Sequence, residues 1–198
     1  MDSQAASSKT IANALPAYKW NTEFTEKVIA KLTPELFDWR PETKDGSWHF
    51  SLGELAAHIV DAGLMFYGQL SGDEFSDGDW FMKPPENFEG GSGEWMPTRE
   101  FTLEDVKAKF AEMRAKFAEV LAWPIEKAHE PTPGTEKAFK EWEKQVEEGK
   151  FPKEFLANGP ATPVRVIATL ISHEAAHRGT LLTLMRVFHG ISFAERES

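Results

Sequence analysis

The sequence predicts an all-α protein, a four-helix bundle with two long loop insertions. Four segments carry apolar residues at alternating spacings of three and four, the period of a helix with one buried face. No segment alternates apolar and polar residues as a half-buried strand does. With 198 residues, of which 41% are hydrophobic, the chain suits one well-buried domain over residues 1–198 and is short for two.

The first predicted helix covers residues 15–32. Pro16 suits the first turn of a helix, where the missing N–H of proline has no partner to lose, and Thr33-Pro34 closes the segment. One apolar stripe, which we expect to face the core, contains Trp20, Phe24 and Val28.

The second predicted helix begins at Ser51 and ends at Ser71-Gly72. Ser51 and Glu54 have the spacing of a capping box, in which each side chain bonds the free backbone N–H of the other residue. The residues that share its core face are Leu55, His58, Ile59, Ala62 and Phe66.

The third predicted helix follows Thr102, a good N-cap, and Pro124 ends it. Its apolar positions repeat in the way of a helix packed nearly parallel to its neighbours in a bundle. These positions are Leu103, Val106, Phe110, Met113, Phe117 and Val120.

The fourth predicted helix has Thr162 as N-cap, Pro163 at the first helical position and Gly190 as its C-terminal stop. It therefore runs to His189. Its predicted core stripe is Val166, Leu170, His173, His177, Leu181, Leu184 and Phe188.

Two long connections interrupt this pattern. Residues 72–101 are rich in Gly, Pro and acidic residues, whereas residues 123–161 contain the segment TEKAFKEWEKQVEEG, which predicts a short helix at 135–149. We expect the tryptophans of the chain to pack in the core more often than to stack on a ligand.

Composition excludes several classes of function. The net charge of −10, with scattered basic residues, argues against nucleic acid or an anionic membrane surface as a partner. The chain has no cysteine, so a disulfide, a thiolate metal site and a catalytic thiol are excluded, and any metal must be held by His, Asp or Glu. The first residues have no signal pattern, and no apolar run approaches a membrane span, so we expect a soluble cytoplasmic protein.

Three histidines predict a metal site. His173 and His177 are four residues apart, so their side chains can point at one ion, and both replace core residues on the fourth stripe. His58 lies on the core face of the second helix. A buried, unpaired ring nitrogen costs about 1–3 kcal/mol, and a shared metal ion would satisfy several of them at once. Any one of these residues taken alone has a structural role as its simplest explanation.

Three neutral imidazoles favour a divalent ion with an open coordination position for water, hydroxide or an anionic ligand. Zn²⁺ in such a site lowers the pKa of its water to about 7. Because imidazole also suits Ni²⁺, Cu²⁺ and Fe²⁺, the ligand type alone leaves the metal open.

The segment HEAAH, residues 173–177, also matches the H-E-x-x-H signature of zinc peptidases, with Glu174 as the possible base. The extended form of that motif requires Gly at position 180 and His at position 183, where this chain has Thr180 and Thr183. His189 lies roughly 18 Å beyond His177 along a continuous helix, too far to share an ion. We therefore reject a peptidase.

The segments KLTPELFDWRP, WHFSLGELAAHIVDAG and SHEAAHRGTLLTLMR, in this order from about residue 31 to 186, resemble the DinB/YfiT-like superfamily of metal-binding four-helix bundles. The resemblance implies that His58, His173 and His177 are the metal ligands, commonly to Ni²⁺ or Zn²⁺, and that the protein is a homodimer. Characterised members of that superfamily include metal-dependent thiol S-transferases that use low-molecular-weight thiols, and others are proposed hydrolases.

Two functional hypotheses follow. In the first, the protein is a metal-dependent enzyme, a thiol S-transferase or a hydrolase of a small molecule, in which Glu174 is a proton shuttle or a partner of the metal ligands and Arg178 contacts an anion. Both residues lie off the predicted stripe, so a surface position is the alternative for each. In the second hypothesis, the protein is a non-catalytic metal- or ligand-binding module.

Overall fold

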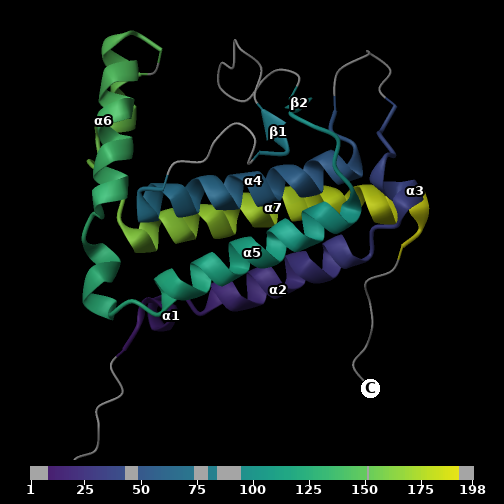
Figure 1. Ribbon diagram of the computed structural model, residues 1–198, viewed down its shortest axis with the longest axis horizontal. Helices are drawn as coiled ribbons and strands as arrows, with labels where there is room; N and C mark the ends of the chain where they lie inside the picture. Colours follow the sequence, from purple (N-terminus) through teal and green to yellow (C-terminus); the bar gives the residue numbers. More distant parts are fainter. Residues whose placement is uncertain (1–8, 43–48, 74–79, 84–94, 151, 192–198) are drawn as a thin grey trace, which may run out of the picture.

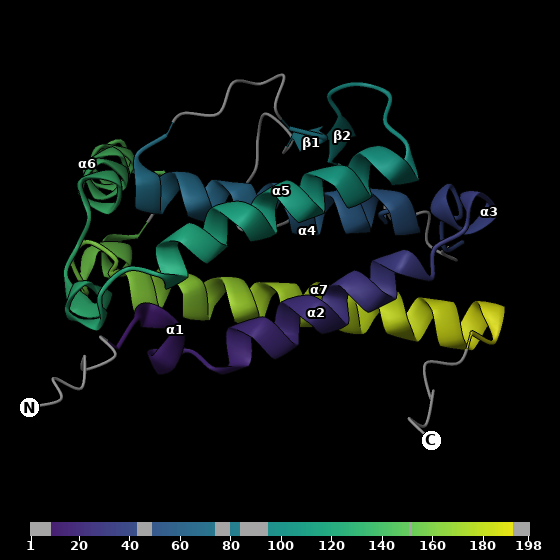
Figure 2. The same ribbon diagram turned by 60° about the horizontal axis from the view of Figure 1, so that its bottom comes forward.

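The computed structural model describes residues 9–42, 49–73, 80–83, 95–150 and 152–191. The predicted all-α class is confirmed. Four long helices lie side by side (Figures 1 and 2), and each packs against two of the others, in the order α4, α7, α2, α5 and back to α4. These helices are α2 (Ala17–Ala30), α4 (Leu52–Ser71), α5 (Leu103–Leu121) and α7 (Pro163–His189).

Smaller elements join and flank the long helices. Strands β1 and β2 form a two-stranded antiparallel sheet, in which Met82 pairs with Pro97 and Lys83 with Met96. This short pairing lies in a segment that the sequence predicts to be a loop. The smaller elements are α1 (Ile11–Ala14), α3 (Pro34–Phe37), β1 (Met82–Lys83), β2 (Met96–Pro97), η2 (Ile125–His129), α6 (Pro133–Glu147) and η3 (Lys153–Leu156).

The predicted ends of α4 are confirmed by their hydrogen bonds. The backbone N–H of Ser51 donates to Glu54 Oε2 at 2.7 Å, and the backbone N–H of Glu54 donates to Ser51 Oγ at 3.1 Å. At the other end, Gly72 adopts a left-handed conformation with φ of 82°, which a residue with a side chain adopts only under strain. The pattern of α5 is also confirmed, since all six predicted core residues are buried.

The predicted core stripe of α2 is wrong in part. Val28 is buried as predicted and Phe24 is half-buried, but Trp20 is 64% exposed, and the helix also buries Asn21 and Thr25. A stripe of large apolar residues is the usual sign of a core face, but here small polar side chains take that place because they find hydrogen-bond partners on α7.

The core stripe of α7 is also rotated from its predicted position. Phe188 is 60% exposed, whereas Glu174 and Arg178 are buried. The buried line along the helix is Val166, Leu170, Glu174, Arg178, Leu181 and Met185. Successive residues point about 100° apart, so the histidine line and the Glu174 line face different neighbours.

Helix α6 confirms the predicted short helix and starts slightly earlier. It stands across one end of the bundle (Figure 1) and packs against α4. The contact is close at Gly134, where an added Cβ would lie 2.5 Å from the backbone N of Gly72 and 2.6 Å from the carbonyl O of Gln69. Within the described part of the chain, no helix has the length and apolar character to cross a membrane.

The contact at Gly134 predicts a specific effect of substitution. Gly134→Ala must push backbone atoms apart, so we expect the free energy of unfolding to fall by about 1–3 kcal/mol and α6 to lose amide protection from hydrogen exchange. Denaturant unfolding and hydrogen exchange measure the two effects.

The matched control is Gly179→Ala on α7, where an added Cβ meets no atom within 4 Å among the described residues. Because glycine destabilises a helix interior, this variant should be more stable than wild type by roughly 0.5–1 kcal/mol. Equal effects of the two substitutions would contradict the close packing of α6 on α4.

Candidate metal centre

The structure brings the three predicted histidines to one place. His58 comes from α4, whereas His173 and His177 come from successive turns of α7, the helix that packs against α4. Each offers one ring nitrogen, and these three atoms lie within 4.8 Å of one another. The ring centroids are 5.2 Å apart for His58 and His173, 4.8 Å for His58 and His177, and 4.4 Å for His173 and His177.

The surroundings keep these imidazoles neutral. Burial, with smaller contributions from His177 and His173, lowers the pKa of His58 to about 3. Burial also lowers the pKa of His173 to about 4, with a smaller contribution from His177, and lowers that of His177. Neutral imidazole is the form that binds a metal ion, so the site is in its metal-binding state at neutral pH.

Two ring nitrogens of the site lack a hydrogen-bond partner among the described residues. Nδ1 of His58 and Nδ1 of His173 are buried, and neither bonds to any group in the part of the chain that the structure describes. A buried polar atom without a partner is costly, and three clustered imidazoles are a donor set that divalent ions accept. The three histidines therefore fit a divalent metal ion.

Aromatic side chains hold the histidine rings on several sides. The ring of Phe50 stacks on His58 with centroids 5.2 Å apart, and Trp95 meets the same imidazole edge-on at 4.6 Å. Phe66 contacts His173 edge-on at 6.2 Å. These contacts limit rotation of the histidine rings.

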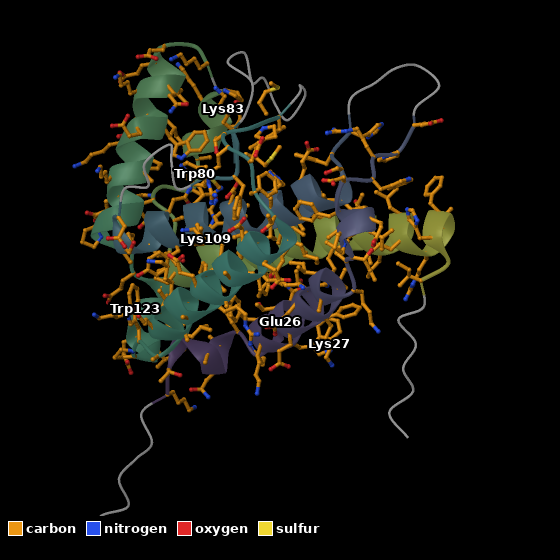
Figure 3. All side chains as sticks on the ribbon, turned by 45° about the vertical axis from the view of Figure 1, so that its right-hand side comes forward. Glu26, Lys27, Trp80, Lys83, Lys109 and Trp123 are labelled. Atoms are coloured by element: carbon orange, nitrogen blue, oxygen red, sulfur yellow. The ribbon has the colours of Figure 1, made fainter. Side chains whose placement is uncertain are left out.

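The histidines line a cavity of about 870 Å³. Helices α4 and α7 form its floor, and the two long connections of the sequence form much of its wall. Helix α6 contributes Phe139 and Trp142, and the segments around the short sheet contribute Trp80 and Trp95. Figure 3 shows Trp80 and the neighbouring Lys83 on the side of the bundle where α6 stands. Three tryptophans thus line the cavity, which differs from the core position expected from the sequence.

Glu174 and Arg178 are buried against α2, so the surface position that was the alternative for each residue is wrong. Asn21 Nδ2 donates to Glu174 Oε2 at 2.7 Å. Arg178 Nη1 donates to the Asn21 carbonyl O at 2.9 Å, to Asn21 Oδ1 at 2.7 Å and to Thr25 Oγ1 at 2.9 Å. The guanidinium carbon also lies 4.8 Å from the ring centre of Phe24. Four residues, Asn21, Thr25, Glu174 and Arg178, form what we call the α2–α7 polar cluster.

This cluster bears on the catalytic role predicted for Glu174. The residue has no exposed surface and is not among the residues that line the cavity, and burial raises the pKa of its carboxyl. Likewise, Arg178 does not line the cavity. Proton transfer by Glu174 and anion binding by Arg178 stay predictions, and the position of both side chains favours a role in holding α7 against α2.

Asp61 is a buried residue of the cavity lining that sequence reasoning missed. The residue is 2% exposed and lines the cavity, and its carboxylate accepts hydrogen bonds from the backbone N–H groups of Phe81 and Met82. Asp61 thereby ties β1 to α4. The available signal was an acidic residue in the apolar run of the second predicted helix, three residues after His58.

The fold and the site together define a helical-bundle protein with a three-histidine centre that can hold a metal ion. The sequence model described as the DinB superfamily matches residues 17–181 of the chain. The chain therefore belongs to the DinB superfamily, which confirms the resemblance of its three sequence segments. Searches of curated proteins and of solved structures found no match.

Asp61 predicts a pH-dependent stability. Burial raises its pKa from 3.8 to about 6, so the stability linked to its proton is fully present below pH 3.8 and is lost as pH rises through about 6. One oxygen, Oδ2, accepts from both N–H groups, at 3.1 and 2.8 Å, so an amide oxygen in its place keeps both bonds. Relative to wild type, the unfolding free energy of Asp61→Asn should rise by about 2 kcal/mol from pH 4 to pH 7.

Denaturant unfolding at several pH values measures this difference. Asp38→Asn, the same change at an exposed position, is the control and should show no comparable rise. A difference between Asp61→Asn and wild type that does not change with pH would contradict the burial of the Asp61 carboxylate.

The α2–α7 polar cluster predicts that substitutions of Arg178 and Glu174 lower the free energy of unfolding by unequal amounts. Arg178→Gln removes the buried donor of three hydrogen bonds to Asn21 and Thr25 of α2 and should lower the unfolding free energy by about 3–5 kcal/mol. Glu174→Gln keeps an oxygen that accepts from Asn21 Nδ2, so this substitution should lower the unfolding free energy by only about 1–2 kcal/mol. Denaturant unfolding of both variants checks the order, and a larger cost for Glu174→Gln would refute it.

Proposed function

We propose that this protein is a metal-dependent enzyme that acts on a small molecule, as a thiol S-transferase or a hydrolase. The observation that carries the proposal is the convergence of three neutral imidazoles from α4 and α7 on the wall of a large apolar cavity. Cavities of roughly 300–1,000 Å³ with a few converging polar groups are the usual form of small-molecule sites.

His58, His173 and His177 would hold the ion, Zn²⁺ or Ni²⁺ being the best candidates. A bound ion of this kind supplies a Lewis acid that lowers the pKa of a coordinated water or thiol. The chain has no cysteine, so a thiol nucleophile has to come from a second small molecule. Phe50 and Trp95 pack against the His58 ring and would help to hold it in place as a ligand.

A second candidate function is a metal- or ligand-binding module without catalysis. The observation in its favour is the shortage of proton-transfer groups in the cavity. Among the described residues that line it, Asp61 is the one carboxylate, and its oxygens are engaged by the backbone of β1. A measurement of turnover distinguishes a binding module from an enzyme.

The metal site predicts a loss of affinity in His58→Ala. We expect wild type to bind one equivalent of Zn²⁺ or Ni²⁺, and the variant to bind it at least tenfold more weakly because one of three ligands is removed. Calorimetric titration and elemental analysis measure affinity and stoichiometry. His129→Ala, which removes an exposed histidine outside the cluster, is the control. Unchanged binding by His58→Ala would disprove the three-histidine site.

If the protein is an enzyme of this kind, its turnover should depend on the bound metal ion. The metal-loaded protein is tested against low-molecular-weight thiols with electrophiles, and against esters and amides. We expect activity in at least one class, its loss on treatment with a chelator, and its recovery when the metal is restored. Full metal occupancy without turnover in any class would favour the binding module.

A further inference from the structure

The cavity extends from the histidines along one face of α7. Arg165, Thr169, His173 and His177 follow one another at steps of four residues, and all four line the cavity. At a rise of 1.5 Å per residue, Arg165 lies roughly 12 Å from His173 along the helix axis. The site is therefore elongated, with three imidazoles toward one end and a guanidinium toward the other.

The cavity between these two ends is apolar. Residues Thr135, Ala138, Phe139 and Trp142 line it at the spacing of a single face of α6. On α4, Met65 also lines the cavity and is 41% exposed. Aromatic and methionine side chains in such walls suit a flat or flexible apolar body.

The charges in the cavity favour an anion, although the chain as a whole carries −10. The charged side chains that line it are Asp61, Lys83 and Arg165, apart from the histidines. The Asp61 carboxylate is engaged by two backbone N–H groups. Among the described residues, neither Arg165 nor Lys83 forms an ion pair.

Arg165 suits a carboxylate better than Lys83 does. Its guanidinium presents N–H groups in a planar fork that matches the two oxygens of a carboxylate, whereas an ammonium is a point charge. Arg165 also stands on α7, the helix that carries two of the three histidines, so its distance from them is set by one continuous element.

We propose that the cavity binds an elongated apolar carboxylic acid. Its carboxylate pairs with Arg165, its aromatic or aliphatic body packs against Phe139 and Trp142 of α6, and its other end reaches the three histidines. This assignment extends the proposed function, because it describes the substrate class of the same site. It also gives the insertion that contains α6 a role, as the wall that selects this ligand.

The experiment compares two probes of equal shape, 6-phenylhexanoate and its primary amide, on the full chain treated with a chelator at pH 7.5. Calorimetric titration measures both affinities. Wild type should bind the acid about three- to fivefold more tightly than the amide, the upper part of the range for an exposed ion pair, because Arg165 is exposed. Arg165→Gln should bring the two affinities within about twofold of each other. The affinity for the acid should fall, and the affinity for the amide should stay the same.

Three further variants separate the alternatives. Arg186→Gln, an exposed arginine of α7 outside the cavity, should keep the preference for the acid. Trp142→Ala should weaken both probes alike, because it removes apolar contact and leaves Arg165 in place. A preference that survives Arg165→Gln, or that is lost in Lys83→Gln instead, overturns the placement of the carboxylate. Failure of wild type to bind the acid overturns the ligand class.

This experiment is separate from the test of the proposed function. The probes are measured without a metal ion and without turnover, so a failed metal titration leaves the binding result intact. Conversely, if the protein binds the ion but neither probe, the metal centre is supported and the assigned ligand class is wrong. Thermal unfolding of each variant confirms that the cavity is still folded at the temperature of the titration.

Discussion

The site depends on the rotation of α7 about its own axis, and the α2–α7 polar cluster sets that rotation. Glu174 and Arg178 are buried, and Asn21 and Thr25 supply hydrogen bonds to them from α2. Turning α7 away would leave a buried carboxylate and a buried guanidinium without partners, at a cost of several kcal/mol. Because residues 173 and 177 each precede a member of the cluster by one position, the same rotation directs both histidines toward α4.

Burial then gives the three histidines two properties at once. It keeps them neutral, because burial lowers the pKa of each, and it leaves Nδ1 of His58 and Nδ1 of His173 without partners among the described residues. Neutral rings with unmet bonding capacity are suited to a metal ion. The aromatic residues around them extend this environment into the cavity. There the two long connections add an apolar wall, and Asp61 holds one part of that wall in place through β1.

Local sequence signals predicted much of the fold. The capping pair Ser51 and Glu54 and the stop at Gly72 located α4, and the spacing of three and four along α5 identified its buried residues. These features act within a few residues of one another, so their physics is visible in a short stretch of sequence. The core faces of α2 and α7 were predicted only in part. Val28 and Leu170 are buried as predicted, whereas Trp20 and Phe188 fit an apolar stripe but are exposed.

By itself, the sequence determined the helical class, the positions of the four long helices and the three histidines as one candidate site. Each of these follows from periodicity, capping or residue chemistry along the chain. Only the tertiary structure decided which face of α7 packs against α2. It also decided that α6 and the segments around the short sheet line the cavity. Asn21 and Glu174 are 153 positions apart, and their hydrogen bond exists only once two helices have packed. Local patterns alone do not predict that charged residues such as Glu174 are buried, because burial is tolerated only when their hydrogen-bond partners are present, and packing of the two helices supplies those partners.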